Sequence, residues 1–192
     1  MHYSKKLIGS TAAALVLASG NALASGSAGV YYADFGDGGD GFGIEGSFML
    51  GDSFRLFGDV TMVDEEGFET DIVRIGGSFV LPMSEQMSIE VGGSFQNWEM
   101  TFSDPFFGTM SADDDAIGLH GILNFAVTPE FHLRASAEYL MFDDLDDEDF
   151  VLGFRGTYFV TPEISVFGGV EIYTNDDLFD ENLLKIGASF NF

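Results

Sequence analysis

The chain ends with Leu183-Leu184-Lys185-Ile186-Gly187-Ala188-Ser189-Phe190-Asn191-Phe192, a stretch that alternates between two kinds of side chain. Counting back from the last phenylalanine, every second residue is apolar, and the residues between them are Asn, Ser, Gly and Lys. This period of two is that of a β-strand with one apolar and one polar face. A protein core and a lipid bilayer are the two environments that cover such a face, and the rest of the chain decides between them.

The N-terminal segment has three parts that together predict a secretory signal peptide. Two lysines form a short positive region, residues 7–18 are mostly apolar, and a small-x-small cleavage signature follows at 22–24. The apolar run is too short to cross a membrane as a helix. We therefore predict a cleaved signal peptide over 1–24 and a single mature domain over 25–192.

The composition is strongly acidic and contains no cysteine. The sequence has 32 aspartates and glutamates against seven lysines and arginines, which gives a formal net charge of −25. Binding of nucleic acid needs a basic surface, so this charge excludes it as a function. The absence of cysteine means that an exported chain relies on no disulfide for its stability.

Two kinds of connection alternate along the mature chain. Short, nearly neutral connections include two copies of Val-Thr-Pro-Glu, at 127–130 and 160–163, in which proline ends a strand. Longer and very acidic connections alternate with them. These acidic connections lie near 36–41, 64–70, 103–115, 143–149 and 175–182.

The segments between these connections predict ten strands. Most have roughly 10 to 13 residues, which suits tilted strands that cross a bilayer. They lie near 27–36, 41–50, 54–63, 69–81, 86–102, 115–127, 131–142, 150–160, 164–174 and 183–192.

Short turns at one end and longer loops at the other are typical of an outer-membrane barrel with an even number of strands. We therefore predict an all-β fold, a transmembrane antiparallel up-and-down β-barrel of ten strands. Eight strands is the alternative, because that number is commonest for barrels of this size.

Strand parity places every basic residue of the mature chain on the polar face of a strand. Charges in the middle of strands need a partner or water, and a barrel lumen supplies both. A soluble β-sandwich would leave unexplained why no base lies in a loop. We predict a locally neutral lumen network of ten residues. Its members are Glu45, Arg55, Asp59, Arg74, Glu90, Arg134, Glu138, Arg155, Glu171 and Lys185.

These features together resemble the small proteobacterial outer-membrane β-barrel families of the opacity type or OmpA-like type. The stretches at 41–48, Gly-Phe-Gly-Ile-Glu-Gly-Ser-Phe, and 161–163, Thr-Pro-Glu, are particularly similar to that group. The resemblance implies an integral protein of the outer membrane of a Gram-negative bacterium, in contact with the bilayer and its lipopolysaccharide leaflet. It also implies that Phe190 and Phe192 form a C-terminal signal for the outer-membrane assembly machinery.

The chain offers little for catalysis. The mature part has only His120 and His132, both on the predicted lumen face, and a nucleophile must lie within hydrogen-bonding reach of its base. Ser94 or Ser136 near a histidine would be the candidates, and membership of a polar lumen network explains them better. We predict that the protein is not an enzyme and has no cofactor; a lipid-modifying enzyme is the third hypothesis.

Bulky side chains on the lumen face, Trp98, Leu140 and Tyr173 among them, predict a plugged or very narrow interior. We therefore expect a structural or surface-interaction role for a barrel with a strongly acidic loop crown. The alternative is a narrow porin-like channel, in which the acidic rim would favour cations.

The densest acidic run lies in the connection at 143–149. Carboxylate oxygens suit Ca²⁺ or Mg²⁺, but no run has the spacing of an EF-hand. We therefore predict diffuse, loose binding of such cations rather than a specific metal site. The residues are Asp143, Asp144, Asp146, Asp147, Glu148 and Asp149.

Overall fold

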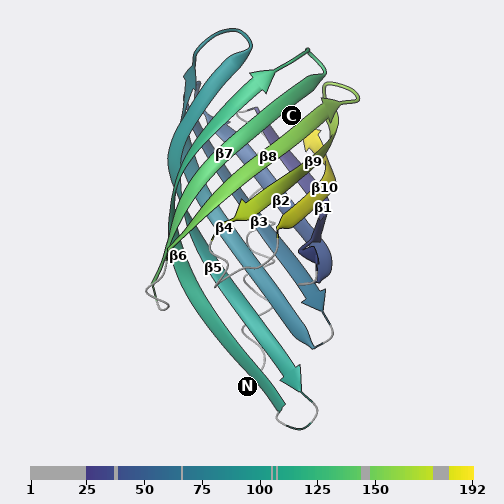
Figure 1. The fold of residues 1–192 in the computed structure, drawn as a ribbon. Helices are drawn as coiled ribbons and strands as arrows, with labels where there is room; N and C mark the ends of the chain where they lie inside the picture. The colour runs from purple at the N-terminus through teal and green to yellow at the C-terminus, as the bar shows by residue number, and fades with distance from the viewer. Residues whose placement is uncertain are drawn as a thin grey trace.

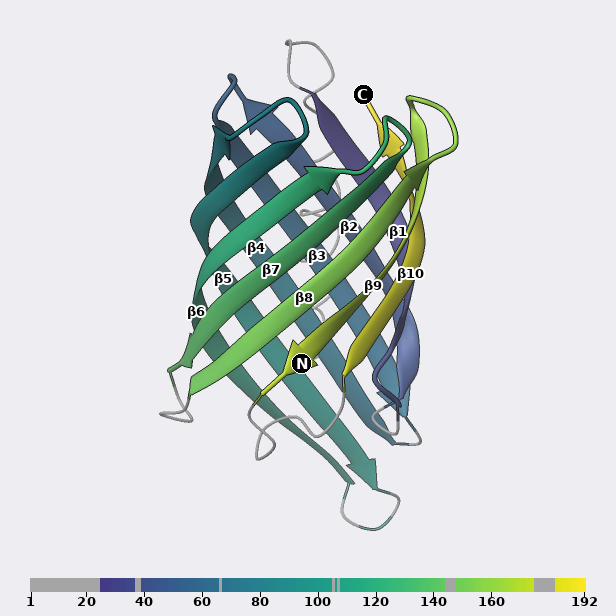
Figure 2. The ribbon, with the colours of Figure 1, turned by 45° about the horizontal axis from the view of Figure 1, so that its top comes forward.

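The structure, a computed structural model, describes residues 25–36, 39–65, 67–104, 106, 108–143, 148–174 and 182–192. The predicted signal peptide, 1–24, lies outside the described residues. Ten antiparallel strands close into one barrel (Figure 1, Figure 2), which confirms ten strands rather than eight. No helix within the described ranges is long and apolar enough to cross a membrane.

The strands follow one another around the barrel in sequence order. They are β1 (Gly26–Asp34), β2 (Asp40–Leu50), β3 (Phe54–Glu65), β4 (Phe68–Pro82), β5 (Met87–Asp104), β6 (Gly108–Ala126), β7 (Phe131–Phe142), β8 (Glu148–Phe159), β9 (Ile164–Tyr173) and β10 (Leu183–Asn191).

The C-terminal stretch closes the barrel. Strand β10 pairs antiparallel with β1, from Ser27 opposite Asn191 to Asp34 opposite Leu184. Phe192 continues this seam, because its N–H donates to the Gly26 carbonyl at 2.9 Å and its carbonyl accepts from the Gly26 N–H at 2.7 Å. The C-terminus therefore lies at the end of the barrel that carries the short connections, which we call the turn end; the opposite end is the loop end (Figure 2).

The longest hairpin, β5–β6, corrects one predicted connection. We expected an acidic loop over 103–115, but the ladder runs without a break to Asp104 opposite Gly108, so Asp113 and Asp115 lie in a strand. Continued pairing satisfies backbone groups that a loop would leave to water. Both aspartates are exposed, so the pairing does not remove their charges from solvent. This hairpin projects beyond the other strands at the loop end (Figure 2).

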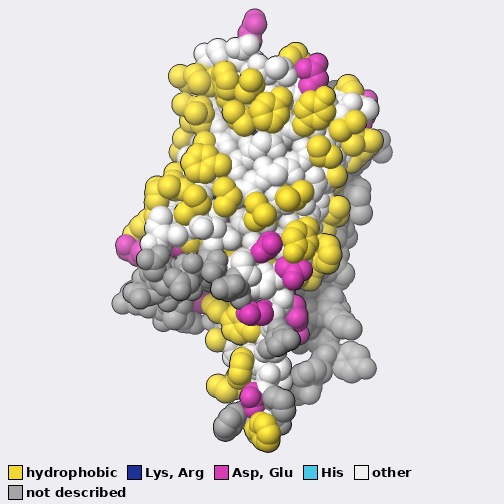
Figure 3. Space-filling model, turned by 45° about the vertical axis from the view of Figure 1, so that its right-hand side comes forward, with side chains coloured by type: hydrophobic (Ala, Val, Ile, Leu, Met, Phe, Trp, Pro, Cys, Tyr) yellow, Lys and Arg dark blue, Asp and Glu magenta, His cyan; other side chains and the backbone are white. Residues whose placement is uncertain are grey.

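The face of the barrel in Figure 3 carries broad areas of apolar side chains, and acidic side chains lie at both ends, more of them toward the loop end. Aromatic residues on the outer face, such as Phe79 and Tyr158, are half exposed or more. No lysine or arginine appears on the face shown. Exposed apolar side chains on the outer face of a closed barrel are the arrangement of a membrane barrel, the inverse of a soluble protein.

Candidate functional site

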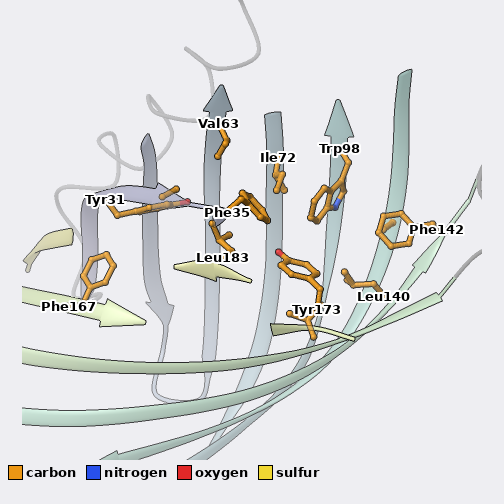
Figure 4. Close-up of a cluster of buried hydrophobic side chains, with 13 residues drawn as sticks. Tyr31, Phe35, Val63, Ile72, Trp98, Leu140, Phe142, Phe167, Tyr173 and Leu183 are labelled. Carbon is orange, nitrogen blue, oxygen red and sulfur yellow. The ribbon is translucent and has the colours of Figure 1, made fainter. Parts of the chain in front are cut away.

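Buried apolar side chains form a cluster in the lumen (Figure 4), and we call eight of them, which lie toward the loop end, the apolar plug. Trp98 lies at its centre, with its ring edge-on to Phe142 at 6.1 Å and to Tyr173 at 5.9 Å. Every member is at most 8% exposed, so the loop half of the lumen is packed. Its members are Phe35, Val63, Ile72, Trp98, Leu140, Phe142, Tyr173 and Leu183.

A layer of charged residues lies next to the plug on its turn side. Arg74 is the hub, because its guanidinium reaches Asp59 at 2.7 Å and both Glu138 and Glu171 at 3.4 Å. Lys185 binds Glu171 at 2.9 Å and approaches Asp59 at 4.0 Å. We call these five residues the central charged layer; it holds three acids and two bases.

Strand geometry explains why the plug and this layer are adjacent. Inward-facing residues recur every second position, so the next inward residue toward the loops stands directly above each charge. On β4, Ile72 is the next inward residue from Arg74 toward the loops, and on β7 Leu140 is the next one from Glu138. The step from a charged to an apolar residue is repeated on neighbouring strands, and this repetition builds two separate layers.

A second charged layer lies nearer the turn end, and we call it the arginine layer. Arg155 holds Glu45 through two hydrogen bonds, of 2.6 and 2.7 Å, and stacks on the Phe167 ring with its Cζ 3.4 Å from the centroid. Arg55 approaches Glu90 at 3.4 Å. The fifth member is Arg134, so this layer holds two acids and three bases.

The two layers are distinct because no described ion pair joins them. On β3, Arg55 lies four residues from Asp59 toward the turn end, and on β7 Arg134 lies four residues from Glu138 in the same direction. At about 3.3 Å per residue, this offset is roughly 13 Å along these two strands. On β2, by contrast, Glu45 stands opposite Asp59 in the β2–β3 ladder, so the two layers meet there.

A cavity of about 550 Å³ occupies the turn half of the lumen. Both charged layers line it, together with Ser84, Ser88 and Asn191 at the turn end. None of the plug residues lines it. In the described part of the chain, the lumen is therefore hollow and polar on one side and filled with apolar side chains on the other.

The structure places all ten residues of the predicted lumen network on the inward face. It brings nine of them together as ion pairs and leaves Arg134 without one shorter than 4 Å to any described residue. Sequence parity missed the neutral groups that complete the network. Ser78 and Asn124 each donate a hydrogen bond of 2.8 Å to Glu90, for example.

One group of residues has the composition of a catalytic triad but the wrong order. Ser94 donates to Oε1 of Glu138 at 2.6 Å, and Nδ1 of His120 lies 3.8 Å from the same oxygen. A triad needs the histidine between the nucleophile and the acid, whereas here the carboxylate lies between them. A side chain at Gly118 would collide with both the Ser94 hydroxyl and the Glu138 carboxylate. These three side chains are therefore better explained as part of the packed lumen network than as a catalytic site.

Acidic residues outside the lumen form cross-strand rows at the loop end. On the outer face, Asp71 stands opposite Glu99, which in turn stands opposite Asp113. Partial burial raises the pKa of Asp71 above its usual value, and the nearby charges of Glu99 and Glu69 raise it further. Like charges directly opposite each other destabilise a sheet, so these rows cost free energy at neutral pH.

The predicted cation-binding run is only partly described. Asp144, Asp146 and Asp147 lie outside the described residues. Asp149 is buried, and its Oδ1 accepts hydrogen bonds from the N–H of Phe150 at 2.6 Å and of Thr174 at 3.0 Å. Over the described ranges, no group of three or more acidic or histidine side chains is arranged to hold a metal ion. Asp149 thus has a structural role in joining β8 to the segment after β9.

Comparison with known proteins shows the fold and nothing finer. No family model matches the chain, and no curated protein matches its sequence. The KdgM porin structure aligns with 86% of this chain and 99% of its own, at 12% identity and a TM-score of 0.51. The structure of Ail, the attachment invasion locus protein of Yersinia pestis, aligns with 88% of this chain and 97% of its own, at 16% identity and a TM-score of 0.48. The likeness to KdgM porin shows the fold of an outer-membrane β-barrel.

Proposed function

We propose that this protein is a non-enzymatic barrel, integral to the outer membrane of a Gram-negative bacterium, that does not conduct and acts through its acidic loop end. The observation that supports this most strongly is the apolar plug. Trp98, Leu140 and Leu183 are each 1% exposed, so the lumen is closely packed with side chains around them. Small barrels generally fill with side chains in this way.

In this proposal the turn end faces the periplasm and the loop end faces outside, where the acidic side chains form an anionic crown. Phe190 and Phe192 would serve the assembly machinery as a C-terminal signal, in addition to the closing of the β1–β10 seam. The crown would repel the phosphates of a lipopolysaccharide leaflet, and loosely bound Ca²⁺ or Mg²⁺ would relieve that repulsion.

Single-channel recording tests the non-conducting proposal. We expect the refolded mature chain, residues 25–192, to insert into a planar bilayer and to give no discrete current steps, with or without calcium. Simultaneous replacement of Trp98 and Tyr173 by alanine should open the plug and produce steps, which also shows that insertion is efficient. Discrete steps from the unaltered chain would contradict the proposal.

A narrow cation-preferring channel is the second candidate. The cavity already reaches from the turn end to the central charged layer, so displacement of the plug alone would connect the two ends. An acidic rim would then concentrate cations at the outer mouth. In the same recordings, steps from the unaltered chain that are cation-selective and suppressed by calcium would favour this candidate.

A further inference from the structure

The arginine layer has an unequal number of charges. Both of its carboxylates already have an arginine, since Glu45 is held by Arg155 through two hydrogen bonds and Glu90 lies 3.4 Å from Arg55. Glu90 also accepts from the Ser78 hydroxyl and the Asn124 amide. The layer therefore has one guanidinium more than it has carboxylates, and Arg134 shares Glu90 with Arg55 as its main counter-charge.

Arg134 is the arginine that lacks a carboxylate of its own. No hydrogen bond or ion pair within 4 Å joins it to any residue that the structure describes. Its cross-strand neighbour on β8 is Arg155, and like charges directly opposite each other are destabilising. A guanidinium held inside a barrel without a carboxylate of its own within 4 Å is costly, so this position favours an anion.

The cavity offers room and access for such an anion. Arg55, Arg134 and Arg155 all line it, with the Ser136 hydroxyl beside them, in a volume of about 550 Å³. Volumes of this order are typical of small-molecule sites. The mouth at the turn end is mostly neutral and polar, with Glu85 as its one lining acid in the described residues. Farther in, Nε2 of the buried His120 also lacks a hydrogen-bond partner in the described chain.

We propose that Arg134 anchors a site for one small oxyanion, a carboxylate or a phosphate, that enters the lumen from the turn end. The planar fork of a guanidinium matches two oxygens of such an anion. One negative charge there neutralises the layer and relieves the repulsion between Arg134 and Arg155. Because the apolar plug closes the far side, the anion is held rather than passed through. Only the side of entry, the periplasm, rests on the proposed function.

The site predicts an unusual effect of mutation on stability. In buffer without phosphate or carboxylate, Arg134→Gln should unfold at a denaturant concentration equal to or above that of the unaltered barrel, because it removes an unpaired charge. Lys185→Gln removes an equal charge from the central layer, where it is paired with Glu171 at 2.9 Å, and should unfold at a lower concentration. If Arg134→Gln destabilises the barrel as much as Lys185→Gln does, Arg134 already has a partner and the proposal fails.

Titration of the folded, detergent-purified barrel tests binding directly. Inorganic phosphate and acetate are titrated separately at constant ionic strength, by calorimetry, into the unaltered barrel, Arg134→Gln, Arg134→Lys and Lys185→Gln. We expect saturable binding of at least one anion, weakened at least about tenfold by Arg134→Gln, less by Arg134→Lys, and little by Lys185→Gln. Binding of one anion alone identifies the class of ligand. Absence of saturable binding of either anion, or equal binding by Arg134→Gln, would overturn the proposal.

Discussion

The two halves of the lumen are built from the same ten strands, but one is filled with apolar side chains and the other is lined with paired charges around a cavity. Toward the loop end, buried apolar side chains such as Trp98 and Tyr173 pack against each other across the lumen. Toward the turn end, charged side chains pair across the lumen and leave a cavity of about 550 Å³. The first half gains its stability from packing, whereas the second depends on charge compensation, so each half should respond to a different kind of perturbation.

Removal of the largest plug side chain should have the largest effect. Trp98→Ala deletes a side chain that is 1% exposed and leaves a cavity, which costs about 3–5 kcal/mol of unfolding free energy. Denaturant titration of the barrel in lipid measures this loss. Phe106→Ala is the matched control, because Phe106 is 92% exposed, and it should change the free energy by less than about 0.5 kcal/mol. Equal effects of the two variants would mean that the plug is not a packed core.

Loss of the hub of the central charged layer should have the next largest effect. Arg74→Met leaves Asp59, Glu138 and Glu171 facing one another with only Lys185 to compensate them. Removal of one partner of a buried ion pair costs about 3–5 kcal/mol, and we expect the lower end because the Arg74 side chain is 21% exposed. The same denaturant titration applies. A variant as stable as the unaltered barrel would show that the layer contributes no net stability.

Calcium should affect the loop end rather than the lumen. At low ionic strength, it should raise the melting temperature by about 2–4 °C, which corresponds to about 1 kcal/mol for a chain of this size. The reason is relief of repulsion among the acidic strands and loops. Thermal melts with calcium and with sodium at matched ionic strength separate binding from simple screening. An unchanged melting temperature would refute the diffuse cation-binding crown.

The smallest effect concerns Asp71, whose pKa is raised in the folded protein by partial burial and by Glu99 and Glu69. Because the fold holds this proton more tightly than the unfolded chain does, protonated Asp71 stabilises the barrel at low pH. That contribution is lost as the pH rises through the raised pKa. Asp71→Asn should therefore be more stable than the unaltered barrel at neutral pH, by about 0.2–1 kcal/mol before screening by salt, and the difference should shrink in acid. A difference that does not vary with pH would contradict this.

Parity along single strands was sufficient to predict much of this architecture. The ten strands follow from the alternation of short and acidic connections. The inward direction of residues such as Arg74 follows from a period of two, which is a local property. The partners of Arg74 do not follow, because Glu171 lies 97 residues away and on a strand that is not adjacent to β4. Such contacts depend on strand tilt and on register summed around the whole barrel.

Two other features could not be predicted from the sequence of single strands. The extension of the β5–β6 hairpin into the predicted loop depends on pairing between strands, which overrides the low strand preference of residues such as Asp113 and Asp115. The separation into an apolar plug and two charged layers depends on the height of each residue in the barrel. A run of alternating residues such as Arg134, Ser136, Glu138 and Leu140 contains that order along one strand but does not show that neighbouring strands repeat it.

Thiol labelling is the most direct test of a lumen open only at its turn end, because the chain has no cysteine of its own. Ser136→Cys places a thiol in the cavity, and Ser111→Cys places one on the exposed loop end of β6. A small, lipid-impermeant thiosulfonate is added outside liposomes that contain either variant. The reagent reaches the loop-end thiol only in barrels whose loop end faces out. If the lumen opens only at the turn end, it reaches the cavity thiol only in the oppositely oriented barrels. The labelled fractions of the two variants then add up to the whole population, whatever the mixture of orientations. Complete labelling of Ser136→Cys alongside partial labelling of Ser111→Cys would show a lumen that is open at both ends.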